Sequence, residues 1–276
     1  MSIEQGNILI TGATGLVGAR LLPRLQQQRW NCRALVRSGK SVPAGVTAIA
    51  GDLFTATSLA QALPGVSAII HLAAVFRTED TDLIWKSNLE GTRNLIEATK
   101  KHAPDARFIF AGTSHVYNIN NPHPGSEQDA VEPQHAYPAS KVAAEQALRE
   151  SGLNWVVLRF PFVYGDGDGH LEMLPRHVTA GNWHPAAKIS TIHHRDIATA
   201  VNMALAGTFD KRIVNITDEA PTSVYELIQL TGAQMPSSAE PLQNPWHLHA
   251  DASLARSLGF QPVVRTVYQA VQENIL

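Results

Sequence analysis

The 276-residue sequence has little cysteine, little net charge and no long apolar run. Its one cysteine, Cys32, excludes an intramolecular disulfide and fits a reducing compartment. A formal net charge of -2 excludes a chain-wide electrostatic field for nucleic acid or an anionic membrane. No apolar run reaches the roughly 18 residues that a membrane span needs, and we expect no signal peptide at the N-terminus. These absences predict a cytoplasmic protein without nucleic-acid or membrane partners.

Histidine, by contrast, is plentiful, and two pairs invite a metal interpretation. His193 and His194 are adjacent, and His247 and His249 are two apart. No cysteine or acidic residue completes a tetrahedral set at useful spacing. We therefore predict no metal site.

Short β-branched apolar runs alternate with longer amphipathic stretches along most of the chain. Strands are predicted at 7–11, 32–36, 46–50, 68–73, 107–113, 155–160 and 212–217, and helices at 16–28, 82–102 and 137–151, with another opening near 222–224. Strands this apolar are buried on both faces, which is typical of a parallel sheet between helix layers. The fold class is therefore α/β, with a doubly wound parallel sheet of the Rossmann type. Residues 236–249, rich in Pro, Ser and His, are predicted to be irregular.

A glycine-rich turn follows the first predicted strand and opens the first helix. Gly12 allows a sharp turn, Gly15 a close approach of backbone N–H groups to a phosphate, and Gly18 tight packing of helix on strand. The helix N-terminus adds free N–H groups and a partial positive charge. Strand before and helix after make dinucleotide binding the favoured interpretation over an ordinary βα turn. The predicted pyrophosphate contacts are Gly12, Thr14, Gly15, Leu16, Val17 and Gly18.

Residues 11–18, TGATGLVG, resemble the cofactor turn of the extended short-chain dehydrogenase/reductases, the NAD-dependent epimerase/dehydratase family. Further segments match that family's pattern in the same order: 51–53, 71–74, 88–92, 137–141, 158–165, 192–198 and 251–262. The resemblance implies a dinucleotide-binding Rossmann domain over residues 1–164, with 190–217 returning to it. Residues 165–276 would then form mainly a small, discontinuous C-terminal lobe that binds substrate. The cofactor contacts implied by it are Asp52, Leu53, Leu72, Ala73, Ala74, Asn88, Pro161 and Val163, with Asn88 alternatively bracing the helix near Lys141.

Tyr137 and Lys141 lie four residues apart, on one face of the predicted helix. A phenol with a pKa near 10 is a weak base at neutral pH, and a nearby ammonium favours its ionised form. Such a tyrosine can exchange a proton with an alcohol or carbonyl as hydride moves to or from nicotinamide. We predict Tyr137 and Lys141 as catalytic residues, and the resemblance also places Lys141 and Tyr137 at the nicotinamide ribose. The resemblance further implies that Thr113, four residues before Tyr117, is the helper that polarises the reacting oxygen, with Ser114 the alternative.

The end of the second predicted strand carries Arg37 where an NAD enzyme usually has an acid. A guanidinium binds a 2′-phosphate through two hydrogen bonds, whereas a carboxylate repels it. Ser38 and Lys40 are placed to assist Arg37 in binding this phosphate. We predict a preference for NADP(H). The alternative is that Arg37 stacks on adenine and that both NAD(H) and NADP(H) bind.

Departures from the family pattern narrow the chemistry. Sugar-nucleotide dehydratases carry Thr-Asp-Glu where this chain has Thr113, Ser114 and His115, and epimerases often have Asn where Phe162 stands. The shorter pocket region resembles the dihydroflavonol-reductase-like branch. We therefore predict NADP(H)-dependent reduction of a small carbonyl compound, or the reverse oxidation. The predicted substrate contacts are Phe76, Ser114, His115, Phe162 and Trp183.

Two other functions stay open. A nucleotide-sugar epimerase survives because Arg176, Lys188 and Arg195 can contact anions. A non-catalytic redox sensor that binds NADP(H) is the alternative of another class, although Tyr137 and Lys141 argue against it. The resemblance also implies a homodimer formed through the helices over 82–102 and 137–151.

Overall fold

The structure is a computed structural model that describes residues 6–276, and it divides into two compact units. The first contains residues up to 112 together with 133–158 and 201–213, and the second contains 113–132, 159–200 and 214–276. The chain thus passes between the units several times. The predicted boundary at residue 164, between a cofactor-binding domain and a substrate-binding lobe, stays a prediction.

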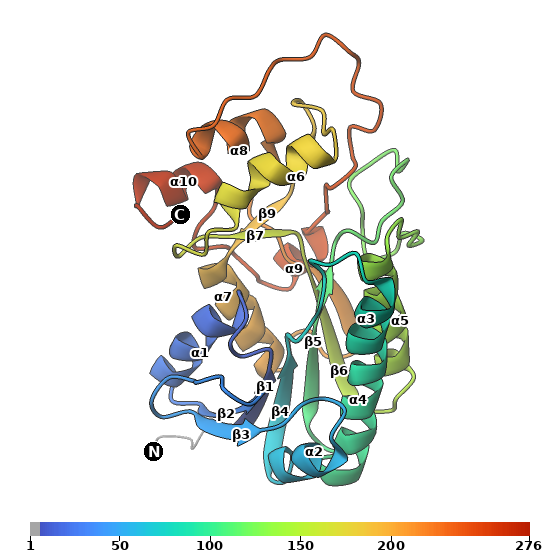
Figure 1. Cartoon of the computed structure of the whole chain (residues 1–276), viewed down its shortest axis with the longest axis vertical. Coiled ribbons are helices and arrows are strands. Elements are labelled where there is room, and N and C mark those ends of the chain that lie inside the picture. The colour runs from blue at the N-terminus through green and yellow to red at the C-terminus, as the bar shows by residue number, and fades with distance from the viewer. Residues whose placement is uncertain (1–5) are drawn as a thin grey trace. The chain divides into compact units, whose positions relative to one another are not determined.

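One seven-stranded parallel sheet has the order β10-β6-β5-β4-β1-β2-β3 (Figure 1). Its strands are β1 (Asn7–Thr11), β2 (Asn31–Val36), β3 (Thr47–Ala50), β4 (Val66–His71), β5 (Arg107–Thr113), β6 (Asn154–Phe160) and β10 (Arg212–Asn215). All seven predicted strands are present. The prediction ran two residues too far at β4 and at β10, because apolar composition does not mark where a strand leaves its ladder. The sheet confirms the α/β doubly wound fold class.

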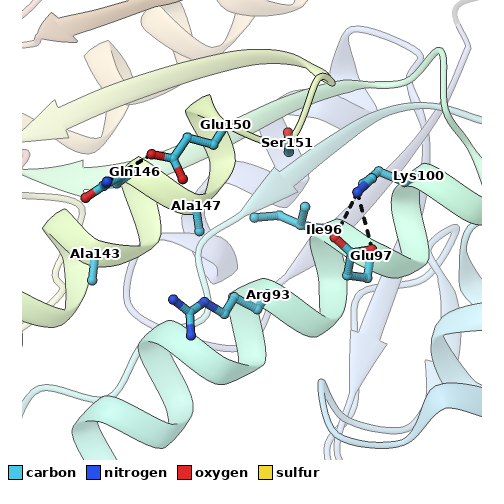
Figure 2. Close-up of a pocket in the computed structure, with 9 residues that line it drawn as sticks. All are labelled: Arg93, Ile96, Glu97, Lys100, Ala143, Gln146, Ala147, Glu150 and Ser151. Atoms are coloured by element: carbon cyan, nitrogen blue, oxygen red, sulfur yellow. Dashed lines mark hydrogen bonds and ion pairs between the residues drawn. The ribbon is translucent and has the colours of Figure 1, made fainter.

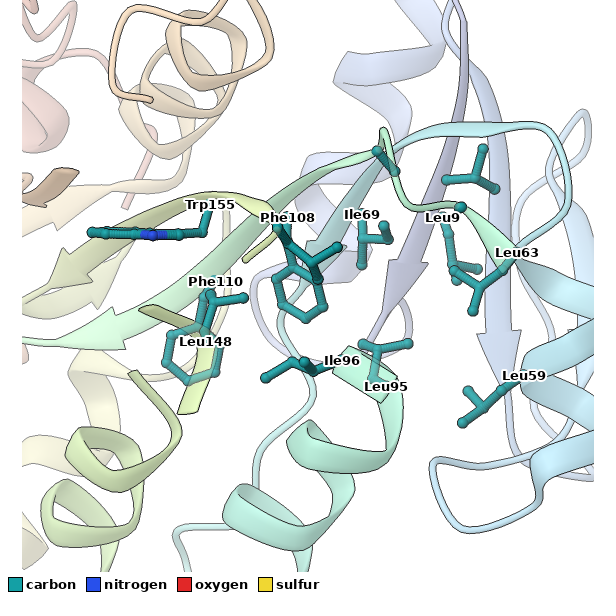
Figure 3. Packing of buried hydrophobic residues seen from close by; sticks show 14 of the residues in the cluster. Leu9, Leu59, Leu63, Ile69, Leu95, Ile96, Phe108, Phe110, Leu148 and Trp155 are labelled. Carbon is teal, nitrogen blue, oxygen red and sulfur yellow. The ribbon is translucent and has the colours of Figure 1, made fainter. Parts of the chain in front are cut away.

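Helices cover both faces of this sheet within the first unit. They are α1 (Gly18–Gln27), α2 (Ala56–Ala62), α3 (Thr81–Trp85), α4 (Gly91–His102) and α5 (Ala136–Arg149). Figure 1 shows α3, α4 and α5 on one face and α1 on the other. Between the α4–α5 layer and the sheet lies a core that includes Leu9, Ile69, Leu95, Phe108 and Leu148 (Figure 3). Continuous apolar strands are needed here because both sheet faces are covered.

The helix predicted over 82–102 is interrupted by a π-helical turn, η1 (Lys86–Glu90). The predicted helix is present over its whole length, and the π-turn inside it was not predicted, because apolar periodicity does not reveal one wide turn. Asn88 lies in this turn and is 1% exposed. π-turns inside α-helices are often found at functional sites, and this one carries a predicted site residue.

The second unit has its own small strand pairs. β7 (Phe162–Tyr164) pairs in parallel with β9 (Thr191–His193), and β8 (Lys188–Ile189) pairs antiparallel with β11 (Thr222–Ser223). Its helical segments are η2 (Leu171–Met173), α6 (Leu174–Ala180), α8 (Val224–Leu230), α9 (Ser253–Ser257) and α10 (Val267–Gln272). Helix α7 (His194–Leu205) begins in this unit, ends in the first, and was not predicted.

Local sequence explains where α8 begins. Ser223 accepts a hydrogen bond from the Glu226 N–H, and Glu226 accepts one from the Ser223 N–H, which makes a capping box. The helix predicted to open near 222–224 is thus confirmed. Residues 236–249 contain no helix or strand, as predicted. Across residues 6–276, no helix has the length and apolar character to cross a membrane.

Candidate active site

The glycine-rich turn is built as its sequence predicts. Gly12 has φ +71°, and a Cβ placed there would lie 2.6 Å from the Ala73 backbone nitrogen. A Cβ at Gly18 would lie 2.3 Å from the Gly12 carbonyl oxygen. The turn therefore packs directly against the backbone that follows β4, and neither glycine has room for a side chain.

The glycine-rich turn leads into the N-terminus of α1 at Gly18. Within the described chain no side chain caps this helix, and no acidic residue lies in its first turn. Thr14 and Gly15 are exposed beside it, with Leu16 and Val17 half-buried. An uncapped helix start next to an exposed glycine fits the pyrophosphate of a dinucleotide.

A chain of hydrogen bonds runs through the interior behind this turn. His71 Nδ1 lies 2.5 Å from the Thr11 hydroxyl oxygen, and His71 Nε2 lies 2.8 Å from the Thr92 hydroxyl oxygen. Since the Thr92 hydroxyl donates to the Asn88 carbonyl, it accepts from His71 Nε2–H. His71 is therefore neutral with its proton on Nε2, and Thr11 donates to Nδ1.

Asn88 carries the network on to α5. Its side chain accepts from the Val75 N–H at 2.8 Å and donates to the Val75 carbonyl at 2.9 Å and to the Ser140 hydroxyl at 3.0 Å. Ser140 in turn donates to the Tyr137 carbonyl oxygen at 2.8 Å. Asn88 thus braces the segment that holds Tyr137 and Lys141, which is the alternative role that the sequence had left open.

The buried His71 makes a pH-dependent prediction. Burial, with a smaller effect of the Lys141 charge, lowers the pKa of His71 to about 3. In the unfolded chain the pKa of this histidine is near 6.5. Below pH 6.5 the unfolded state therefore binds a proton that the folded state does not bind. The free energy of unfolding should therefore fall by about 1.4 kcal/mol per pH unit from this residue alone, as the pH drops from about 6 towards 3. Denaturant unfolding at several pH values measures this slope.

The matched variants are His71→Gln and His177→Gln, since His177 is exposed. His71→Gln should be less stable at pH 7 but should show a shallower slope. His177→Gln should keep the wild-type slope. Equal slopes in wild type and His71→Gln would contradict the assignment.

Tyr137 lies in the first turn of α5 and is half-buried. Its ring centroid is 5.5 Å from that of Phe76, a predicted substrate contact that is 44% exposed. Arg77 stacks over the same Phe76 ring at 4.9 Å. The structure therefore brings one predicted substrate contact next to the predicted catalytic tyrosine.

Lys141 is deeply buried, at 2% exposed. Its Nζ lies 3.9 Å from the centroid of the Phe110 ring. Burial lowers the pKa of Lys141 to about 7, and the Glu145 charge one turn further along α5 partly offsets this. Burial thus disfavours the charged form of this lysine, which the sequence did not predict.

The predicted adenine-side residues lie on loops of the first unit. Arg37, Ser38 and Lys40 follow β2 and are all exposed. The Asp52 carboxylate accepts from the Phe54 N–H at 2.8 Å, and this hydrogen bond lowers its pKa. The remaining predicted contacts of this unit, Leu53, Leu72, Ala73 and Ala74, are half-buried.

Thr113 and Ser114 belong to the second unit and are both buried. The Thr113 hydroxyl oxygen accepts the His115 N–H at 3.2 Å. Among residues 6–276 nothing accepts a hydrogen bond from the Thr113 hydroxyl, so its proton is available to a ligand. His115 itself is exposed.

The other predicted contacts of the second unit lie around β7. Phe162 is 8% exposed and stacks on His170 at 4.4 Å, while the Val163 carbonyl accepts from the His170 ring at 2.7 Å. Pro161 is buried beside them. Trp183 packs against the core of the unit and is half-buried.

One of the two histidine pairs that had suggested a metal, His193 and His194, makes hydrogen bonds instead. His194 Nε2 lies 2.8 Å from an Asp168 carboxylate oxygen, and His193 Nε2 lies 2.8 Å from the Ile275 carbonyl oxygen. Over the described part of the chain, no three His, Cys, Asp or Glu side chains gather as a metal site would need.

A separate groove of about 420 Å³ runs between α4 and α5 (Figure 2). Figure 2 shows Lys100 paired with Glu97 along α4, and Gln146 bonded to Glu150 along α5. None of the predicted site residues lines this groove. It lies between the two helices predicted to form a dimer.

Sequence reasoning missed several residues that build the site. Thr11, His71 and Thr92 form the buried network, and Phe110 lies under Lys141. A polar residue at the end of each apolar strand was the available signal for Thr11 and His71. Thr92 lies in the segment 88–92 that matches the family pattern, whereas nothing local to Phe110 distinguishes it from an ordinary core residue.

Residues 8–217 match the family model described as the NAD dependent epimerase/dehydratase family. This chain belongs to that family. The match confirms the prediction of an NAD(P)-dependent enzyme of the short-chain dehydrogenase/reductase type. It does so only as far as the family, because the shared fold carries several reactions.

Individual relatives differ in activity. A ceramide reductase from Caulobacter vibrioides (strain NA1000 / CB15N) is 30% identical over 203 residues, covering 70% of this chain and 59% of its own length. An N-acetyl-alpha-D-glucosaminyl-diphospho-ditrans,octacis-undecaprenol 4-epimerase from Escherichia coli O157:H7 is 30% identical, covering 64% of this chain and 55% of its own. The chain thus spans less than two thirds of the length of these two relatives. A solved structure of MoeE5 with UDP-glucuronic acid and NAD is 25% identical, with a TM-score of 0.76 over 97% of this chain and 100% of that one.

Proposed function

We propose that this protein is an NADP(H)-dependent oxidoreductase that reduces a small carbonyl compound, or oxidises the corresponding alcohol. The observation that carries the proposal is the placement of Tyr137, half-buried beside Phe76 and one helical turn before the buried Lys141. A half-buried phenol on a braced helix can meet a substrate and keep its orientation. The pattern resembles the dihydroflavonol-reductase-like branch of the family.

The proposed chemistry divides between cofactor and protein. A bound nicotinamide cofactor supplies or accepts the hydride. Tyr137 donates its hydroxyl proton to the carbonyl oxygen as that oxygen becomes negative, and takes the proton back in the reverse direction. Lys141, when charged, favours the phenolate left behind. Thr113 donates its hydroxyl proton as a hydrogen bond to the carbonyl oxygen, since its own oxygen already accepts the His115 N–H.

The proposed cofactor contacts combine the turn and the loops described above. The uncapped start of α1 with Gly12, Gly15 and Gly18 would hold the pyrophosphate. The other proposed contacts are Thr14, Leu16, Val17, Arg37, Asp52, Leu53, Leu72, Ala73, Ala74, Asn88, Tyr137, Lys141, Pro161 and Val163.

NADPH fluorescence titration followed by a panel of aldehydes and ketones tests the proposal. We expect saturable NADPH binding and NADPH oxidation with at least one carbonyl compound. Saturable binding without turnover on any substrate would instead favour the redox sensor.

A nucleotide-sugar epimerase is the second candidate. It is favoured by the 4-epimerase relative and by the likeness to a solved structure that contains UDP-glucuronic acid and NAD. Phe162 argues against it, because a buried phenyl ring stacked on His170 has no donor for a diphosphate. Tight binding of UDP-glucose or UDP-glucuronic acid to the NAD-loaded protein would favour the epimerase.

Arg37 provides the prediction on cofactor choice. Replacing Arg37 by Ala should weaken NADPH binding by about 10- to 100-fold, because hydrogen bonds to a charged group contribute about 1.5–3 kcal/mol. NADH binding should change by about threefold or less, since NADH has no 2′-phosphate. Paired Kd measurements on wild type, Arg37→Ala and the exposed control Arg212→Ala check this. A wild-type preference of tenfold or more for NADH would refute it.

We also propose a cytoplasmic location and a homodimer formed through α3, α4 and α5. Support comes from the family resemblance and from the reducing setting that a single cysteine, buried and unpaired, fits. The partners proposed are a small-molecule substrate and a second copy of the chain.

A further inference from the structure

Among the described residues, six buried side-chain atoms of the second unit find no hydrogen-bond partner. Two of them, Ser114 Oγ and His249 Nε2, belong to residues that line one small cavity, and these side chains are 4% and 8% exposed. Leaving a buried donor or acceptor unpaired costs about 1–3 kcal/mol. Such a pair in one cavity is therefore expected to have a partner that the protein itself does not supply.

The cavity is small, polar and without formal charge. Its volume of about 10 Å³ is close to the lower limit for one water molecule. The side chains around it include no lysine, arginine, aspartate or glutamate. The cavity is lined by Gly125 and by the side chains of Ser114, His115, Tyr117, Asn118, Asn121, Trp246, His247, Leu248 and His249. Burial lowers the pKa of His249, so that the imidazole is neutral at physiological pH. A neutral oxygen that both donates and accepts fits this cavity, and a phosphate or carboxylate does not.

The segment that carries His249 is held in place. The His249 carbonyl accepts from the Gly125 N–H at 3.0 Å, and the Leu248 carbonyl accepts from the Ser190 N–H at 3.0 Å. Leu248 has φ +67°, a left-handed conformation that is unusual for a bulky residue. Backbone strain of this kind persists only where the surroundings enforce it, and it is common at ligand-binding sites.

We infer that Ser114 and His249 form a subsite that binds one hydroxyl oxygen of the substrate. Ser114 follows Thr113 directly in the chain, with Cα atoms about 3.8 Å apart, so a substrate that reaches both residues would carry its hydroxyl a few bonds from the carbonyl group that Thr113 is proposed to bind. The substrate class is thus a small carbonyl compound with a hydroxyl group close to the carbonyl. This assignment rests on the proposed carbonyl reduction, and it adds His249, a residue of the irregular segment 236–249, to the specificity-determining groups.

Matched substrate pairs test the subsite. Hydroxyacetone, 4-hydroxybutan-2-one and 5-hydroxypentan-2-one are each compared with the corresponding alkanone in kcat/KM with NADPH. For at least one pair the wild type should prefer the hydroxylated member by about tenfold or more, because a site built to bind a hydroxyl rejects analogues that lack it. Ser114→Ala and His249→Leu should bring this ratio to within about threefold of one.

Conservative variants separate hydrogen bonding from packing. His249→Gln and Ser114→Thr keep a neutral polar group and should retain more of the preference than His249→Leu and Ser114→Ala. Ser257→Ala, an exposed serine in the same unit, should leave the ratio unchanged. Thermal unfolding confirms that each variant is folded, and if His249→Leu is not, Ser114→Ala carries the test.

The outcomes distinguish the two proposals. Reduction of alkanones and hydroxyketones at equal efficiency by the wild type overturns the subsite and leaves the proposed function standing. The subsite is also overturned, and the proposed function also stands, if the preference for the hydroxylated substrate survives in both Ser114→Ala and His249→Leu. The cavity would then hold only water. Failure to reduce any carbonyl compound overturns the proposed function, and the subsite with it.

Discussion

Replacing Tyr137 by Phe should lower kcat by about 100-fold or more while the Kd for NADPH stays within about threefold of wild type. The expected loss follows from the size of general acid catalysis, roughly 10²–10⁴-fold. The ring remains in Tyr137→Phe, so its contact with Phe76 at 5.5 Å and the Ser140 bond to the residue 137 carbonyl are retained. Steady-state kinetics on the best carbonyl substrate, with NADPH fluorescence titration alongside, measure both quantities.

Tyr225→Phe is the matched control, because Tyr225 is 42% exposed on α8 and is not a predicted site residue. It should keep wild-type kcat. Wild-type-like kcat in Tyr137→Phe would falsify the proposed proton transfer, and a large loss of NADPH affinity in the same variant would point to a structural role instead.

Replacing Gly18 by Ala should destabilise the fold by about 2–4 kcal/mol, since overpacking against rigid backbone is costly. The new Cβ would lie 2.3 Å from the Gly12 carbonyl oxygen and 2.7 Å from the Ala13 Cα. Neither atom belongs to a flexible side chain, so the turn or α1 must move. For a chain of this size the expected drop in Tm is about 5–15 °C, measurable by thermal unfolding followed by circular dichroism.

Gly15→Ala separates stability from binding. The nearest atom to a Cβ at Gly15 is 3.2 Å away, and the residue is exposed beside the uncapped start of α1. We expect the Tm of Gly15→Ala to stay within about 2 °C of wild type, while NADPH binding weakens by about tenfold or more because the Cβ obstructs the phosphate.

For Gly18→Ala, a Tm within about 2 °C of wild type would contradict the packing argument.

Much of the sheet could be predicted because its strands carry their own signal. Ile8, Leu9 and Ile10 form a run buried on both faces, and such runs define a parallel sheet without knowledge of their neighbours. The glycine turn was predictable from the spacing of Gly12, Gly15 and Gly18, although the constraint at Gly12 also comes from the distant backbone of Ala73. Helix α7 was missed because its residues were interpreted only through the family pattern over 192–198.

The buried parts of the site were harder to predict. Lys141 shows this, because the spacing from Tyr137 predicts a shared helix face but not the Phe110 ring beneath it or the pKa of about 7. His249 shows it too, because residues 236–249 have no regular structure and their composition indicates only an irregular segment. The partners that connect His249 to the rest of the unit, Gly125 and Ser114, lie far away in the chain.

The sequence by itself determined the family and the order of the strands along the chain, and it predicted the residues that are proposed to carry out proton transfer. These depend on neighbouring residues, on periodicity and on short motifs. Only the tertiary structure decided that Asn88 braces α5 through a π-turn, that His71 is a neutral link between Thr11 and Thr92, and that Ser114 and His249 share a cavity. Each of these depends on burial and on hydrogen bonds or a shared cavity between distant residues, and burial is a property of the packed chain, not of any one segment.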